Sequence, residues 1–267
     1  MLLFNYDSWQ IEERYRDAET LQNFASLEDV FSCRGELIVK DKTSEVIKFV
    51  GSNKTYYLKR YTDPRRKYFR FFRSSIVKAE SENLLSMAEI GLPVPNVIAH
   101  GERREGGLFV IGALITEEVK DSANLAFYLK NNTELLKDRK WLHTVIDQVA
   151  DSVREMHEHK FVHRDLNLRN VLVRTQGPPV IHFIDCPAGG FRSGPLLKRE
   201  IVRDLAHLDK VARYLLGKND LLRFYKQYRS INKLTQDDKK LIEQIRHFHD
   251  KKRVKKSQKT DDPYRVI

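Results

Sequence analysis

The sequence has little cysteine and no long hydrophobic run. Its two cysteines, Cys33 and Cys186, are far apart, which excludes a disulfide framework or a cysteine-based zinc site and favours a reducing compartment. The best apolar run, Leu108 to Ile115, has 8 residues, which suits a buried strand and is too short to cross a bilayer. The opening residues become polar and acidic too early for a secretory signal. We therefore expect a cytoplasmic protein. Peripheral contact with the inner face of the cytoplasmic membrane is compatible with this expectation.

Acidic residues are outnumbered, and the chain of 267 residues carries a net charge of +11. This basic balance points to an anionic partner such as a nucleotide phosphate, a nucleic acid, an acidic glycolipid or a membrane surface, although a solvated basic face is the simpler alternative. Hydrophobic residues make up 41% of the sequence, which argues against global disorder. The length suits one compact unit or two closely packed lobes.

The apolar pattern divides the sequence into four parts. Residues 1–30 predict a helical lead-in, and residues 31–120 predict several strands with one inserted helix at 75–90. Residues 121–250 carry apolar positions mainly at helical spacing, and residues 251–267 form a basic tail. A run of strands followed by a run of helices is typical of the α+β class.

The strongest chemical signal is the run His163-Arg164-Asp165, with Asn170 five residues after the aspartate. The apolar strand VIHFID then ends at Asp185. Phosphoryl transfer needs a carboxylate that accepts the proton of the attacking hydroxyl, and it needs oxygen ligands for the magnesium that bridges the nucleotide phosphates. The spacing therefore predicts an ATP-dependent kinase, with Asp165 as the base and Asn170 and Asp185 as magnesium ligands. The alternative is an ordinary turn followed by a strand-end carboxylate.

A second signal is Lys59, in the predicted strand TYYLKRY. Protein kinases hold the α- and β-phosphates with such a strand lysine and fix it with a helix glutamate. Glu80 follows 21 residues later on the predicted helix, whereas Glu82 falls on a different helix face. The predicted catalytic residues are Asp165, Lys59 and Asn170, and the predicted nucleotide contacts are Lys59, Glu80, Glu117, Val119, Asn170 and Asp185.

The runs YYLKRY, AESENLL, GLPVP, VHRDLNLRN, HFID and RDLAHL together resemble the lipopolysaccharide-core kinase family. The resemblance covers about residues 30–216. It implies a bilobal protein-kinase-like fold, with an antiparallel sheet and one helix in the N-lobe and a mainly helical C-lobe. It also implies transfer of phosphate from magnesium-bound ATP to a heptose or Kdo hydroxyl of a lipid-linked core oligosaccharide. Asp204, in RDLAHL, is implied to brace the catalytic loop.

The sequence departs from typical protein kinases at three places. Asn167 stands where those kinases have a lysine, two residues after the catalytic aspartate. The first hairpin lacks G-x-G-x-x-G, so that backbone amides or Lys42, Thr43 and Ser44 must cover the phosphates. Cys-Pro-Ala-Gly-Gly follows Asp185, and only 18 residues separate Asp185 from Asp204. Such a short segment leaves little room to bind a peptide and favours a small-molecule or glycolipid hydroxyl.

Residues 65–73 interleave arginine and lysine with tyrosine and phenylalanine. One interpretation is a surface for a phosphorylated, lipid-linked sugar at the membrane, and the other is a segment whose aromatic side chains pack inward. Nucleic-acid stacking is disfavoured, because no recognised nucleic-acid module accompanies the segment. The lysine-rich tail has the same two options, anionic lipid or solvent.

Other functions stay open from the residues alone. Within enzymes, the alternatives are a protein kinase and an aminoglycoside- or choline-type kinase, and the basic balance argues mildly against a cationic acceptor. Outside enzymes, the alternatives are a pseudokinase and a basic nucleic-acid-binding protein. The joint presence of Lys59, Asp165, Asn170 and Asp185 argues against loss of activity.

Overall fold

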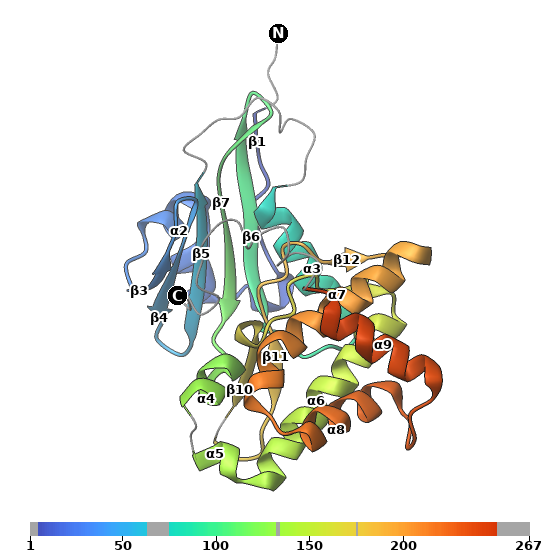
Figure 1. The fold of residues 1–267 in the computed structure, drawn as a ribbon. Coiled ribbons are helices and arrows are strands. Elements are labelled where there is room, and N and C mark those ends of the chain that lie inside the picture. Colours follow the sequence, from blue (N-terminus) through green and yellow to red (C-terminus); the bar gives the residue numbers. More distant parts are fainter. Residues whose placement is uncertain (1–4, 63–74, 132–133, 175, 250–267) are drawn as a thin grey trace. The chain divides into compact units, whose positions relative to one another are not determined.

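The protein is known here from a computed structural model, which describes residues 5–62, 75–131, 134–174 and 176–249 (Figure 1). The chain divides into two compact units. The first comprises residues 1–122, 174–177 and 182–189, and the second comprises residues 123–173, 178–181 and 190–267. The division passes through three short strands, β8 (Ser122–Asn124), β10 (Val171–Arg174) and β11 (Ile181–Phe183). The basic aromatic segment 65–73 and the tail 251–267 lie outside the described residues.

The first unit is built on an antiparallel sheet of order β1-β6-β7-β5-β4-β3, with β2 also paired to β6. The strands predicted for TYYLKRY and for the run Leu108 to Ile115 are confirmed. The sequence did not reveal β6. The strands are β1 (Tyr6–Asp7), β2 (Gln10–Ile11), β3 (Glu36–Lys40), β4 (Ser44–Val50), β5 (Thr55–Thr62), β6 (Val97–Glu105) and β7 (Leu108–Glu117).

Strand β5 positions Lys59 at the centre of this sheet. It lies between β4 and β7, with Lys59 opposite Val46 on one side and Leu114 on the other. Because side chains alternate between the two faces of a strand, Tyr56 and Leu58 point into the buried core while Lys59 and Tyr61 share the other face. The alternation thus brings a tyrosine hydroxyl and a lysine amine to the same place.

Helices cover the sheet of the first unit. The helices are η1 (Glu13–Tyr15), α1 (Ala18–Phe24), α2 (Leu27–Ser32) and α3 (Ile76–Glu89). Phe24, Leu27 and Val30 join the core that contains Tyr56 and Leu58. The lead-in is therefore helical, as predicted, and packs on the sheet, while α3 matches the helix predicted at 75–90.

Helix α3 packs against β6 and β7 (Figure 1). Ser75 caps its first turn by accepting a hydrogen bond from the backbone N–H of Lys78. The face toward the sheet buries Val77, Leu84 and also Glu80, whereas Glu82 is exposed. A buried carboxylate on an otherwise apolar face requires a partner, and Lys59 supplies it.

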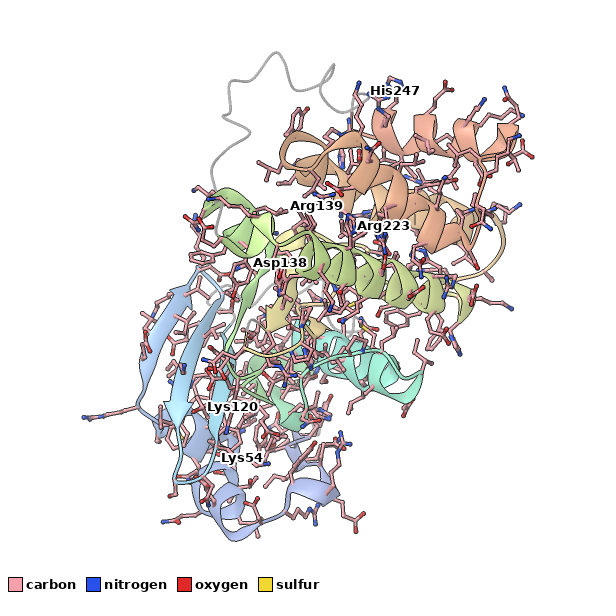
Figure 2. The ribbon with its side chains drawn as sticks, turned by 90° about the horizontal axis from the view of Figure 1, so that it is seen from below. Lys54, Lys120, Asp138, Arg139, Arg223 and His247 are labelled. Carbon is pink, nitrogen blue, oxygen red and sulfur yellow. The ribbon has the colours of Figure 1, made fainter. Side chains whose placement is uncertain are left out.

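The second unit is mainly helical. Its helices are α4 (Leu125–Asn131), α5 (Glu134–Lys137), α6 (Arg139–Glu158), η3 (Leu168–Asn170), α7 (Gly194–Leu215), α8 (Lys218–Arg229) and α9 (Gln236–His247), and β9 (Phe161–Val162) pairs with β12 (Gly190–Phe191). Asp138 caps α6, and Figure 2 shows Asp138 and Arg139 at the start of that helix. The α+β class and the protein-kinase-like organisation predicted from sequence are confirmed. No helix in the described parts of the chain is long and apolar enough to cross a membrane.

Candidate active site

Three of the predicted nucleotide residues of the first unit, Lys59, Glu80 and Asp185, lie together. The Lys59 Nζ donates to both carboxylate oxygens of Glu80, each at 2.9 Å, and to Oδ1 of Asp185 at 2.6 Å. Glu82, the alternative helix carboxylate, pairs instead with Lys78 at 3.8 Å on the exposed helix surface. The structure therefore brings Lys59, Glu80 and Asp185 together and leaves Glu82 outside the group.

Tyr61 is a fourth member of this group, which sequence reasoning missed. Its hydroxyl donates to Oε2 of Glu80, and its ring lies 5.5 Å from Nζ of Lys59. The hydroxyl and the amine thus hold the Glu80 carboxylate from two sides. The signal was present in the sequence, since Tyr61 follows Lys59 by two residues and must share its face of β5.

Burial and charge act in opposite directions on these groups. Burial alone lowers the pKa of Lys59, but the negative charges of Glu80 and Asp185 outweigh it and raise that pKa above its ordinary value. Burial raises the pKa of Glu80, and the charge of Lys59 partly offsets this change. The pKa of Tyr61 is raised by burial and by the neighbouring Glu80 carboxylate. The Lys59 amine is therefore held in its protonated form.

Asp185 is held in a conformation that L-residues rarely adopt. Its φ angle is 60°, in the left-handed region, which costs of order 1 kcal/mol or more for a non-glycine residue. The flanking chain is anchored, because Asn83 Nδ2 donates to the carbonyl of Cys186 at 2.7 Å and the N–H of Phe183 donates to the carbonyl of Pro93 at 2.8 Å. These contacts, with the Lys59 pair, fix the direction of the Asp185 carboxylate.

The turn between β3 and β4 differs from a glycine-rich phosphate loop. The Asp41 side chain accepts hydrogen bonds from the backbone N–H groups of Thr43 and Ser44, each at 2.7 Å. These bonds lower the pKa of Asp41, with the Thr43 N–H as the largest cause. Two amides that were predicted to cover the phosphates are thus already paired with an aspartate. The Lys42 side chain, the other predicted phosphate contact in this turn, takes no part in these two hydrogen bonds.

Glu117 and Val119 lie at and just beyond the end of β7. The Glu117 side chain pairs with Lys54 at 3.3 Å and accepts a hydrogen bond from Asn96 at 3.0 Å. The carbonyl of Val119 accepts a hydrogen bond from Ser122 at 2.6 Å. The Glu117 carboxylate is therefore already paired with Lys54 and Asn96. A nucleotide contact at this end of β7 would have to come from backbone groups.

In the second unit, the predicted catalytic loop gathers polar groups around Asp165. The Asn170 side-chain amide donates to the Asp165 carbonyl at 2.8 Å and lies 3.3 Å from Asp165 Oδ2. Asn167 Nδ2 donates to Oδ1 of Asp165, and Arg169 Nη2 lies 3.4 Å from Oδ2. His207, on α7, places Nδ1 3.9 Å from Oδ1. The Asp165 carboxylate, 34% exposed, is thus oriented by its own loop and stays accessible to a hydroxyl.

Asp204 braces this loop from α7, as the resemblance implied. The fully buried carboxylate accepts the backbone N–H of His163 at 2.8 Å and that of Arg164 at 2.7 Å. Arg164 has a φ angle of 66°, and its guanidinium donates to Glu200 at 3.0 Å. The two backbone bonds compensate the strained residue that immediately precedes Asp165.

Asp185 in the first unit and Asn170 in the second each carry an oxygen of the type that Mg²⁺ prefers. Asp185 gives one carboxylate oxygen to Lys59, and its side chain is 38% exposed. Asn170 uses its Nδ2 for Asp165, which leaves its amide oxygen as the acceptor. Carboxylate and amide oxygens are hard ligands of the kind that Mg²⁺ prefers. A bound ion would neutralise charge on the nucleotide phosphates.

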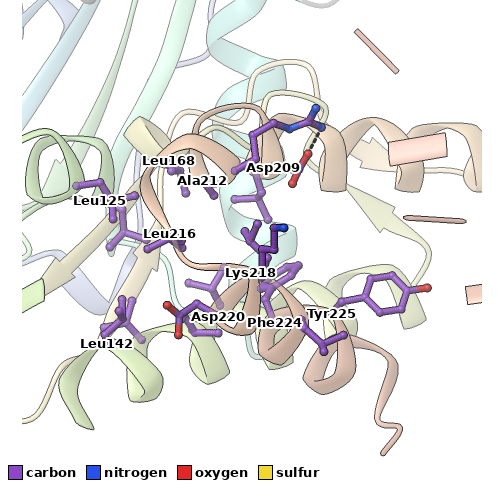
Figure 3. Close-up of a pocket in the computed structure, with 18 of the residues that line it drawn as sticks. Leu125, Leu142, Leu168, Asp209, Ala212, Leu216, Lys218, Asp220, Phe224 and Tyr225 are labelled. Carbon is purple, nitrogen blue, oxygen red and sulfur yellow. Dashed lines mark hydrogen bonds and ion pairs between the residues drawn. The ribbon is translucent and has the colours of Figure 1, made fainter. Parts of the chain in front are cut away.

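A separate cavity of about 580 Å³ lies inside the second unit (Figure 3). It is enclosed mainly by apolar side chains of α6, α7 and α8, among them Leu142, Ala212 and Phe224. Leu168, within the catalytic loop, is also part of its wall, whereas Asp165 and Asn170 are not. The cavity is therefore distinct from the polar group around Asp165.

Comparisons with known proteins identify a matching family and a similar fold. The model of the "Lipopolysaccharide kinase (Kdo/WaaP) family" matches residues 19–228. A solved structure described as "WaaP in complex with acyl carrier protein" superposes with a TM-score of 0.69 at 20% identity, covering 91% of this chain and 98% of that chain. At that identity, the likeness establishes the fold.

Two curated relatives are each named 3-deoxy-D-manno-octulosonic acid kinase. The protein from Mannheimia succiniciproducens is 31% identical over 129 residues, which cover 48% of this chain and 50% of that protein. The protein from Haemophilus influenzae is 29% identical over 97 residues, which cover 36% of this chain and 37% of that protein. The matched segments thus span half or less of the curated relatives.

The fold is that of a protein-kinase-like α+β protein. The family match covers well over half of the sequence, and the chain belongs to the Kdo/WaaP lipopolysaccharide kinase family. This assignment confirms the family resemblance drawn from the motifs around Lys59 and Asp165.

Proposed function

We propose that this chain is an ATP-dependent kinase that phosphorylates a sugar hydroxyl, of Kdo or heptose, in the lipopolysaccharide inner core. The observation that carries the proposal is the bonding of Lys59 to both Glu80 and Asp185, at 2.9 and 2.6 Å, in a chain of this family. A lysine charged and fixed in this way is suited to holding nucleotide phosphates. Kdo is the favoured acceptor, because both curated relatives are named as kinases of that sugar.

In the proposed reaction, Asp165 accepts the proton of the acceptor hydroxyl as its oxygen attacks the γ-phosphorus of ATP. The bond between the γ-phosphorus and the bridging oxygen breaks, ADP leaves, and the proton passes from Asp165 to solvent. Lys59 holds the phosphates, and Asp185 and Asn170 are the proposed ligands of Mg²⁺, which supplies charge neutralisation. Glu117 and Val119 are proposed to contact the nucleotide through backbone groups at the end of β7.

The proposed acceptor also suggests where the protein works. We propose a peripheral enzyme in the cytoplasm, at the inner face of the cytoplasmic membrane, where it would reach a lipid-linked core oligosaccharide. The basic aromatic residues 65–73 and the basic tail 251–267 are the sequence features suited to an anionic surface.

Transfer of labelled γ-phosphate from ATP tests the proposal directly. The purified chain is offered a Kdo-bearing lipid A precursor, the same acceptor extended by heptose, an aminoglycoside and a generic protein substrate, with and without Mg²⁺. We expect label in a Kdo- or heptose-bearing acceptor and only when Mg²⁺ is present. Label transferred only to protein or to the aminoglycoside would contradict the proposed acceptor class.

A further inference from the structure

The catalytic loop contains a cation whose role the predicted site does not explain. Typical protein kinases place a lysine two residues after the catalytic aspartate, and here that position is Asn167. The transferred phosphoryl group spreads negative charge over its oxygens, close to the negative carboxylate of the base. A loop without this lysine needs another positive group near the base, because the phosphoryl oxygens and the carboxylate otherwise repel each other.

Arg169 lies where such a group is needed. Its Nη2 is 3.4 Å from Oδ2 of Asp165, the proposed base. The loop fixes this position, because Asn167 N–H donates to the Asp165 carbonyl and Asn170 N–H donates to the Asn167 carbonyl, each at 2.8 Å. In the 3-10 turn that follows, Leu168 and Asn170 are buried while the Arg169 side chain is 64% exposed. The turn therefore holds the backbone and leaves the guanidinium in solvent beside the base.

A structural role does not account for this arginine. A single exposed ion pair with one contact at 3.4 Å contributes little to the stability of the fold. The neighbouring arginines differ, since Arg164 and Arg203 both pair with the buried carboxylate of Glu200, at 3.0 and 3.4 Å. Those two cations serve the loop support, whereas Arg169 contacts the group that is proposed to react.

We infer that Arg169 is a catalytic residue that stabilises the transferring phosphoryl group, in place of the missing lysine. Without substrate, its guanidinium pairs with Oδ2 of Asp165. With ATP and acceptor bound, the guanidinium shifts to the γ-phosphate oxygens, and Oδ2 becomes available for the hydroxyl proton. The bonds made and broken are those of the proposed kinase reaction, on which this inference rests. A planar guanidinium can contact two phosphoryl oxygens at once, which suits the charge of the transition state.

The test compares four variants of the full chain: Arg169→Ala, Arg169→Lys, Asn167→Lys, and the double variant Arg169→Ala/Asn167→Lys. The matched control is Arg223→Ala, since Arg223 on α8 is also an exposed arginine paired with an aspartate, Asp147 on α6. We expect Arg169→Ala to lower kcat on the order of 100-fold, with the KM for ATP changed by less than about threefold. Arg169→Lys should recover part of the loss, and the double variant should exceed Arg169→Ala, because a cation returns at position 167.

A binding measurement separates this inference from the proposed function. Aluminium fluoride with MgADP mimics the transferring phosphoryl group and needs no sugar acceptor. We expect Arg169→Ala to bind MgADP as the unchanged protein does and to lose most of the gain in affinity that aluminium fluoride provides. The inference is overturned if that gain is intact in Arg169→Ala, or if Arg169→Ala lowers kcat no more than Arg223→Ala does. The unchanged protein could transfer no phosphate to any acceptor and still show an Arg169-dependent gain in MgADP affinity with aluminium fluoride. In that case the proposed acceptor is wrong, and the proposed role of Arg169 is supported.

Discussion

The Lys59–Glu80 pair and the Arg169–Asp165 pair combine the same kinds of charged group in two different environments. Lys59 and Glu80 are 22% and 3% exposed, and two further groups, Tyr61 and Asp185, complete their contacts. Arg169 and Asp165 are 64% and 34% exposed, and a single contact at 3.4 Å joins them. A buried carboxylate must be satisfied for the chain to fold, whereas an exposed pair is nearly neutral for folding and can be rearranged by substrate. Changes in the first pair should therefore affect stability, and changes in the second should affect rate.

Removing the buried carboxylate should have the largest effect on stability. Glu80→Ala leaves the amine of Lys59 and the hydroxyl of Tyr61 without their shared partner. We expect a loss of about 4 kcal/mol in the free energy of unfolding, measured by chemical denaturation. Glu82→Ala, on the exposed face of the same helix, is the control and should change stability by less than about 0.5 kcal/mol.

Tyr61→Phe should lower the unfolding free energy by less than Glu80→Ala and by more than Glu82→Ala. It removes one hydrogen bond to Glu80 and keeps the ring, so we expect a loss of about 1 kcal/mol. If Glu80→Ala and Glu82→Ala proved equally stable, the buried pair would not be part of what holds the first unit together.

The second unit has its own buried carboxylate, and the next largest effect is expected there. Asp204→Ala removes the acceptor for the backbone N–H groups of His163 and Arg164, which then lie buried without that partner. We expect a loss of about 3 kcal/mol in unfolding free energy together with a fall in kcat, because the catalytic loop loses its brace. Asp209→Ala, on the same helix, removes an ion pair to Arg213 and should cost about 1 kcal/mol or less. Equal losses in the two variants would contradict the bracing role.

The smallest expected effect concerns pH. Burial, with the nearby positive charges of His249 and Arg203, lowers the pKa of His207 to about 4 in the folded state. Between about pH 6.5 and 4, His207 is therefore protonated in the unfolded chain and neutral in the folded chain. The free energy of unfolding should fall as the pH decreases through this window. In His207→Gln, the fall in thermal midpoint between those pH values should be smaller. His159→Gln, an exposed histidine at the end of α6, should leave the fall unchanged.

The parts of the site that could be predicted from sequence are those with a fixed order along the chain. The strand that carries Lys59, the helix that carries Glu80 and the loop that carries Asp165 each have a periodic or motif signal. The helix period also distinguished Glu80 from Glu82, because residues two positions apart on a helix point in different directions. These features depend on local geometry, which a single sequence contains.

Features that depend on distant contacts could not be predicted. The two-residue strands β1 and β2 are too short for any alternation and are fixed by pairing with β6, about 90 residues away. The direct bond from Lys59 to Asp185 spans 126 residues. Each is decided by tertiary packing, which leaves no periodic trace in the sequence.

Substitution of the proposed base tests the central claim most directly. Asp165→Asn keeps the size of the side chain and removes its ability to accept a proton, so phosphate transfer from ATP to the Kdo-bearing acceptor should fall by on the order of 1,000-fold. The unfolding free energy should change by less than about 1 kcal/mol, because the carboxylate is partly exposed. A variant that transfers phosphate as fast as the unchanged protein would contradict the assignment of Asp165, and with it the account of this loop as the catalytic centre.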